Sequence, residues 1–239
     1  MTDPVNPRSA LSELQPYEPG KPVDEIAREY DLDEDPVKLA SNENPYSPPE
    51  ALRSTYEAEF EDLNRYPDGG AYHLRKALSQ KYDWPMEGVV IGAGSDEITD
   101  FLARAFLEPG DEVVLSDPSF VRHSMLPRMM GAVPRTIPVT DEYDHDLEGM
   151  LDAINERTRW VFVPNPNNPT SRYVPETRLR SFLNELPDDL VVILDEAYSE
   201  FMDQADFPDG RELTLRLDRS ETAVGVGDTV SVDFDPDAL

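Results

Sequence analysis

Short apolar runs alternate with stretches of helical periodicity through the middle of the chain. The runs have the length of buried strands and lie at Val89–Ile91, Glu112–Leu115, Val133–Val139, Trp160–Val163 and Leu190–Leu194. The helical patterns between most of them lie at Asp96–Leu107, Phe120–Met130, Leu147–Asn155 and Pro175–Leu186. Such alternation is typical of a parallel sheet, because each helix returns the chain along one face of the sheet. The pattern predicts an α/β fold with a mostly parallel sheet covered by helices.

The N-terminal part of the chain has a different texture. Residues 1–48 are rich in proline and turn residues and predict an arm that contains one short amphipathic helix at Val23–Tyr30. Two further helices are expected at Pro49–Glu61 and Ala71–Tyr82, because apolar residues recur there at helical spacing. The run Tyr66–Gly70 between them is composed of turn-forming residues.

The pattern of apolar and polar residues changes again after Pro208. Apolar and polar residues alternate over Glu212–Leu217 and Thr229–Phe234, with glycines between the two segments. A period of two is typical of strands with one buried face. We expect a small antiparallel β unit at 208–239.

Charge narrows the possible partners. The 239 residues include 50 acidic and 21 basic side chains and no cysteine, and the formal net charge is −29. So acidic a chain cannot neutralise a phosphate backbone, which excludes a nucleic-acid binder. No stretch reaches the roughly 20 apolar residues of a membrane helix, and the first residues lack a secretory pattern. We expect a cytoplasmic protein of a salt-adapted cell, where salt screens the repulsion; an ordinary acidic protein is the alternative.

Three segments place polar groups at expected strand ends, where ligands of open α/β sheets bind. Gly92–Glu97 joins a strand to a helix, and the first N–H groups of that helix would face an anion; the alternative is a plain turn with Ser95 as N-cap. Val163–Thr170 holds asparagine amides between three prolines. Leu194–Tyr198 brings Asp195 to a buried strand end, where a carboxylate needs a cationic or donating partner.

Together these segments supply the groups that pyridoxal phosphate requires. The helix start would hold one phosphate, and the acid would keep the ring nitrogen protonated. An amide and a phenol would bond the ring oxygen, and an aromatic side chain would stack on the ring. A dinucleotide is excluded, because Glu97 stands where the third glycine of that fingerprint is required.

The order of seven motifs resembles histidinol-phosphate aminotransferase, a class II aminotransferase of fold type I. The motifs are LQPYEPGKP at 14–22, KLASNENPYSPP at 38–49, RYPDGGAYHLRKAL at 65–78, GAGSDEI at 92–98, DPSF at 117–120, NPNNPT at 165–170 and DEAYSEF at 195–201. The resemblance implies transfer of an amino group between L-histidinol phosphate and 2-oxoglutarate in histidine biosynthesis, by a homodimer that uses pyridoxal 5'-phosphate. A threonine-phosphate decarboxylase or an aromatic aminotransferase is the alternative within the same class.

The resemblance also assigns roles to individual residues. Ser95 and Asp96 would hold the cofactor phosphate, and Phe120 would stack on the ring. Asn168 and Tyr198 would contact the ring oxygen, and Asp195 the ring nitrogen. Three further residues complete the implied set. Tyr66 would contact the cofactor phosphate bound by the partner subunit, and Tyr17 and Asn44 would contact the substrate.

One required group is missing from the sequence. The family's Schiff-base lysine follows the DEAY element, yet the last lysine here is Lys81. Arginine cannot replace it, because a guanidinium stays protonated.

The resemblance also divides the chain into three parts. We expect residues 1–48 to form an arm and small-domain segment, 49–207 an incomplete large domain, and 208–239 a tail unlike the family. The chain would then be catalytically inactive, and a non-catalytic cofactor-binding or interaction protein is the second hypothesis. Ser171 stands where the family usually has glycine after NPT, and this departure leaves the geometry of the local turn open.

Overall fold

A computed structural model describes residues 6–12, 14, 20–32 and 37–212. The described residues divide into two compact units, a larger one that contains residues 6–12, 14 and 68–212 and a smaller one that contains residues 20–32 and 37–67. The two β segments expected at Glu212–Leu217 and Thr229–Phe234 lie almost wholly outside the described residues.

The smaller unit contains the helices expected from its sequence. Helix α1 (Val23–Tyr30) and helix α2 (Glu50–Glu59) match the predicted segments, and a 3-10 turn η2 (Phe60–Asp62) extends α2. Helix α1 ends at Asp31, which has a left-handed backbone with φ 52°. Neither helix has a fully buried residue.

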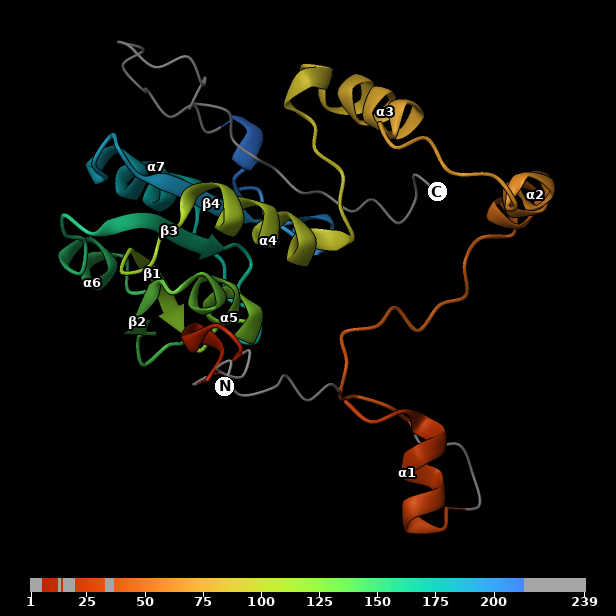
Figure 1. The fold of residues 1–239 in the computed structure, drawn as a ribbon, viewed down its shortest axis with the longest axis horizontal. Coiled ribbons are helices and arrows are strands. Elements are labelled where there is room, and N and C mark those ends of the chain that lie inside the picture. The colour runs from red at the N-terminus through yellow and green to blue at the C-terminus, as the bar shows by residue number, and fades with distance from the viewer. Residues whose placement is uncertain (1–5, 13, 15–19, 33–36, 213–239) are drawn as a thin grey trace, which may run out of the picture. The chain divides into compact units, whose positions relative to one another are not determined.

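The larger unit is built around four parallel strands. Their order in the sheet is β2-β1-β3-β4, and Figure 1 shows the strands side by side. The bounds are β1 (Glu112–Asp117), β2 (Val133–Pro138), β3 (Thr158–Pro164) and β4 (Val191–Asp195). Four of the five predicted strands and the predicted parallel α/β fold are therefore confirmed. The fifth prediction, Val89–Ile91, is wrong, because no described strand pairs with this segment and Val90 is 53% exposed.

Helices cover both faces of the sheet (Figure 1). The helices of this unit are α3 (Tyr72–Tyr82), α4 (Gly94–Phe106), α5 (Val121–Met130), α6 (Leu147–Asp152) and α7 (Glu176–Glu185). Short 3-10 turns occur at η1 (Ser9–Leu11), η3 (Met86–Gly88), η4 (Ser199–Phe201) and η5 (Gly210–Glu212). The predicted helices are confirmed to within three residues at their ends. None of the helices in the described part of the chain is long and apolar enough to cross a membrane.

Alternating residues of β3 supply the two halves of the core. Trp160 and Phe162 pack with residues of α4 and α5, whereas Val161 and Val163 pack with residues of α6 and α7. All four side chains have no exposed surface. The alternation follows from the period of two in a strand, and it shows why β3 reads as a continuous apolar run.

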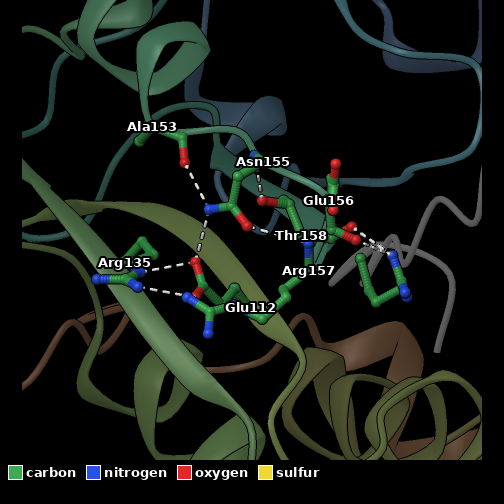
Figure 2. Close-up of polar contacts among 8 residues, drawn as sticks. Glu112, Arg135, Ala153, Asn155, Glu156, Arg157 and Thr158 are labelled. Carbon is green, nitrogen blue, oxygen red and sulfur yellow. Dashed lines mark hydrogen bonds and ion pairs between the residues drawn. The ribbon is translucent and has the colours of Figure 1, made fainter.

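A buried carboxylate fixes the amino end of the sheet. Glu112, 1% exposed at the start of β1, accepts hydrogen bonds of 2.7 Å from both Nε and Nη2 of Arg135 on β2. Asn155 Nδ2 donates a third bond of 2.8 Å, and Arg157 Nη2 forms an ion pair of 2.5 Å. Figure 2 shows these side chains converging on Glu112 from different elements. This cluster, which we call the Glu112 clasp, joins β1, β2 and the segment before β3.

Candidate functional site

Asp195 lies at the carboxyl end of β4 with both oxygens engaged. Its side chain is 11% exposed, Oδ2 lies 3.0 Å from His123 Nε2, and Oδ1 accepts a 3.1 Å bond from the Ala197 backbone N–H. A buried carboxylate needs donors, and the sequence predicted such a partner without identifying it. His123 on α5 is that partner. Two hydrogen bonds hold the carboxylate in one orientation.

The ring of His123 is enclosed by aromatic side chains. It stacks on Phe162 with ring centroids 4.1 Å apart and meets Phe120 edge-on at 5.6 Å. Its Nδ1 lies 2.9 Å from Ser119 Oγ. A carboxylate only accepts hydrogen bonds, so Nε2 carries a proton and donates it to Asp195. Phe120, expected to stack on a ligand ring, is thus one side chain away from Asp195.

The asparagine segment lies beside Asp195 at the same edge. Pro164 is the register partner of Asp195, and the Asn165 backbone N–H donates to the Asp195 carbonyl at 2.8 Å. The Asn165 side chain exchanges two hydrogen bonds with the backbone of Val174, at 2.7 and 3.3 Å. These bonds join the start of the segment to the backbone at Val174.

Asn167 ties this segment to the end of β1. Its Nδ2 donates to the Pro118 carbonyl and to Thr170 Oγ1, each at 3.1 Å. Asn167 is only 2% exposed, and its Oδ1 has no hydrogen-bond partner within the described residues. The next residue, Asn168, is half-buried. Ser171 adopts φ 58°, a left-handed conformation that favours glycine.

The start of α4 forms the third part of the edge. Helix α4 begins at Gly94, where an added Cβ would meet no atom within 4 Å. Ser95 and Asp96 are in its first turn, where backbone N–H groups have no intrahelical acceptor. The alternative reading of Ser95 as N-cap is wrong, because Ala93 occupies that position and its N–H donates to Glu97 Oε2 at 2.6 Å.

Contacts connect the start of α4 to the other segments. The Asp96 carboxylate pairs with Arg122 of α5, one residue before His123. His123 in turn contacts Asp195. The structure therefore brings Asp96, Phe120 and Asp195 into one connected cluster at the carboxyl edge of the sheet. Tyr198 is half-buried and follows Asp195 by three residues.

Three of the expected site residues are not among the described residues of the larger unit. Tyr66 and Asn44 belong to the smaller unit, and both side chains are exposed. Asn44 Oδ1 accepts a 2.9 Å bond from the Tyr46 backbone N–H. Tyr17 lies outside the described residues.

A second histidine, which the sequence reading did not single out, lies beneath the asparagine segment. His145 is 2% exposed, its Nδ1 lies 2.6 Å from Ser116 Oγ, and its Nε2 donates to the Pro164 carbonyl at 2.9 Å. Burial lowers the pKa of His145 below its ordinary value. The neutral ring therefore joins the ends of β1 and β3. The sequence contains only three histidines, and this scarcity was the one available signal for His123 and His145.

Comparison with known proteins identifies the family. The family described as aminotransferase class I and II matches residues 34–229. The chain belongs to the class I and II aminotransferases. A histidinol-phosphate aminotransferase of Desulfotalea psychrophila is 43% identical over 194 residues, which are 81% of this chain and 50% of that protein. One from Caldicellulosiruptor saccharolyticus is 41% identical over 202 residues, or 84% of this chain and 56% of that protein.

Solved aminotransferases share the fold. The histidinol-phosphate aminotransferase of Sinorhizobium meliloti in complex with pyridoxal-5'-phosphate has a TM-score of 0.72 at 25% identity, covering 84% of this chain and 53% of that one. The aspartate aminotransferase of Rhizobium meliloti has the same fold, with a TM-score of 0.71 at 20% identity. The match covers 86% of this chain and 54% of that one. This aminotransferase chain spans about half the length of the curated relatives it matches.

Proposed function

We propose that this chain binds pyridoxal 5'-phosphate at the carboxyl edge of its sheet. We further propose that it belongs to an enzyme of histidine biosynthesis that moves an amino group between L-histidinol phosphate and 2-oxoglutarate. The observation that carries the proposal is Asp195, held by His123 beside Phe120. The names of the Desulfotalea and Caldicellulosiruptor relatives support the substrate, and the Sinorhizobium complex supports the cofactor.

The residues of the cluster offer hydrogen-bonding groups that this cofactor requires. Asp195 is anchored by two donors, so its remaining lone pairs can accept from a protonated ring nitrogen. The start of α4 offers N–H groups to a phosphate, and the space over Gly94 is open. Asn167 Oδ1, buried without a partner, shows that this edge still has hydrogen-bonding capacity to satisfy.

Each residue has a defined task in the proposal. When bound, pyridoxal phosphate supplies an electron-withdrawing ring that stabilises negative charge on the carbon bearing the amino group. Asp195 holds the ring nitrogen in its protonated form, and Phe120 packs against one face of the ring. Asn168 and Tyr198 hold the ring oxygen. Ser95 and Asp96 bind the phosphate through the first turn of α4.

Proton transfer is the step that this chain does not support. A lysine ammonium can give up its proton and act as a base, whereas a guanidinium cannot. The four lysines are Lys21, Lys38, Lys76 and Lys81, and all precede α4 in the sequence. We therefore propose that the chain binds the cofactor and does not catalyse amino transfer by itself.

The remaining assignments complete the proposal. Residues 1–48 form an arm and small-domain segment, 49–207 an incomplete large domain and 208–239 a tail unlike the family. In the complete homodimeric enzyme, Tyr66 contacts the phosphate bound by the partner subunit. Tyr17 and Asn44 shape the substrate pocket.

Titration of the purified chain with pyridoxal phosphate tests the function. Calorimetry is expected to give one site per chain, because the binding groups are present within the larger unit. Addition of L-histidinol phosphate and 2-oxoglutarate is expected to give no glutamate. Asp195→Ala should weaken binding by about a hundredfold, the effect of losing a charge-assisted hydrogen bond in a desolvated site.

Asp188→Ala is the matched control, because Asp188 is an exposed acid in the loop before β4. It should bind the cofactor like the unmodified chain. Absence of binding by the unmodified chain, or equal binding by Asp195→Ala, contradicts the proposed site. Glutamate formation contradicts the assignment of an inactive chain.

We also propose that the protein works in the cytoplasm of a salt-adapted cell, because its net charge is −29. Raising KCl from about 0.1 M to about 1 M shortens the Debye length from about 10 Å to about 3 Å. The thermal midpoint, followed by circular dichroism, is expected to rise over this range because charge repulsion is screened. Sucrose at matched osmolality is the control, and a midpoint that stays constant or falls in KCl rejects the proposal.

A further inference from the structure

Arg122 connects the starts of two helices at the proposed phosphate subsite. Its Nε donates to Asp96 Oδ1 at 2.6 Å and its Nη2 to Asp96 Oδ2 at 2.8 Å, a two-pronged pair. Its Nη1 lies 3.2 Å from Met125 Sδ. All three guanidinium nitrogens are therefore engaged by protein atoms, and the side chain is only 26% exposed.

The charge of Asp96 creates a problem for a phosphate. Asp96, Glu97 and Asp100 place three carboxylates in the first two turns of α4. Asp100 is paired with Arg104, and Glu97 accepts from the Ala93 N–H. A dianion bound at this helix start would meet the Asp96 carboxylate at close range, and like charges repel strongly where water is partly excluded. The cation that offsets Asp96 is Arg122.

We propose that Arg122 is a positioning residue for the phosphate subsite, which it makes selective for the phosphorylated cofactor by neutralising the charge of Asp96. This inference rests on the proposed function, since it concerns the same site. A residue that served folding alone would affect phosphorylated and unphosphorylated ligands alike. The two ligands therefore separate the roles.

The experiment measures dissociation constants of pyridoxal phosphate and of pyridoxal by calorimetry for the unmodified chain and four variants. Arg122→Met should weaken pyridoxal phosphate binding about tenfold, the size of one charge interaction at a partly exposed site, and leave pyridoxal binding unchanged. Asp96→Asn keeps the backbone N–H of residue 96 and should tighten pyridoxal phosphate binding, because the positive charge of Arg122 is then no longer offset. The double variant Arg122→Met with Asp96→Asn should return to within about threefold of the unmodified chain, because the unpaired carboxylate is gone.

Arg128→Met is the matched control, since it removes the same charge from the last turn of α5, where Arg128 is exposed. It should bind both ligands normally. If the unmodified chain binds pyridoxal phosphate and Arg122→Met binds it equally well, only the role of Arg122 is rejected. Equal loss of both ligands in Arg122→Met, or no recovery in the double variant, rejects it too. Failure of the unmodified chain to bind rejects the proposed function together with this inference.

Discussion

Replacing Glu112 by glutamine is expected to lower the free energy of unfolding by about 2 kcal/mol. Glutamine keeps the shape of the side chain but presents an N–H₂ group to guanidinium groups that only donate. The cost stays below that of a fully buried broken pair, because the side chains of Arg135 and Arg157 are 45% and 64% exposed and regain water. Urea denaturation at neutral pH measures the loss.

Acid provides a second measurement on the same clasp. Hydrogen bonds from Arg135, with those from Asn155 and the charge of Arg157, lower the pKa of Glu112 from 4.5 to about 2. A carboxyl with a depressed folded-state pKa stabilises the protein above its unfolded pKa and loses that contribution as the pH falls through the folded value. The free energy of unfolding should therefore fall by about 2 kcal/mol between about pH 5 and pH 2. This value is reduced because solvent screens the two half-exposed arginines. In Glu112→Gln this part of the acid dependence should be absent.

Glu156→Gln is the control for both measurements. Glu156 is exposed in the same connection as Asn155 and Arg157, and Figure 2 shows it directed away from Glu112. The neutralised surface acid should change stability by less than about 0.5 kcal/mol. A loss in Glu156→Gln equal to that in Glu112→Gln would mean that overall charge, and not the clasp, determines acid stability.

The clasp also shows which parts of the fold the sequence could not reveal. Period and length located β1, β3 and β4, because a strand buried on both faces must be apolar throughout. Glu112 was read only as the first residue of such a run. Its partners Arg135 and Arg157 are 23 and 45 positions away, and only the strand register brings them together. The false strand at Val89–Ile91 has the same origin, since an apolar run does not specify a pairing partner.

The sequence located those parts of the site that lie at the carboxyl ends of parallel strands. Asp195 and the segment before Asn168 were expected at one edge because parallel strands end there, and the register of Pro164 with Asp195 confirms that adjacency. The side chains that hold this edge were not found from the sequence. His123, Arg122 and His145 act across 72, 26 and 29 positions respectively, and no local pattern encodes such separations.

Replacing His145 by leucine is expected to cost about 3 kcal/mol of stability. Leucine fits a similar volume but removes the bonds of His145 to Ser116 Oγ and to the Pro164 carbonyl, at about 1–3 kcal/mol for each buried group that loses its partner. Ser116 Oγ keeps only the weak sulfur contact with Met150 Sδ at 3.6 Å, and because Ser116 is 1% exposed, water does not replace the lost bond. Thermal and urea unfolding measure the loss. His73→Leu, which changes an exposed histidine of α3, is the control and should be nearly neutral.

A double variant separates the hydrogen bond from the packing of the ring. Ser116→Ala removes the hydroxyl whose bond His145→Leu would break, so the two changes together should cost about 1 kcal/mol less than the sum of the single changes.

The pH dependence of stability gives a further test of His145. Burial lowers the pKa of His145, and so does the charge of Arg178, whereas the Pro164 carbonyl and Asp144 act in the opposite direction. The unfolded chain therefore binds the proton first, and stability should fall as the pH drops below about 6.5. That fall should be missing in His145→Leu. Strictly additive losses, or an unchanged pH profile in the variant, would show that His145 only fills space beneath the asparagine segment.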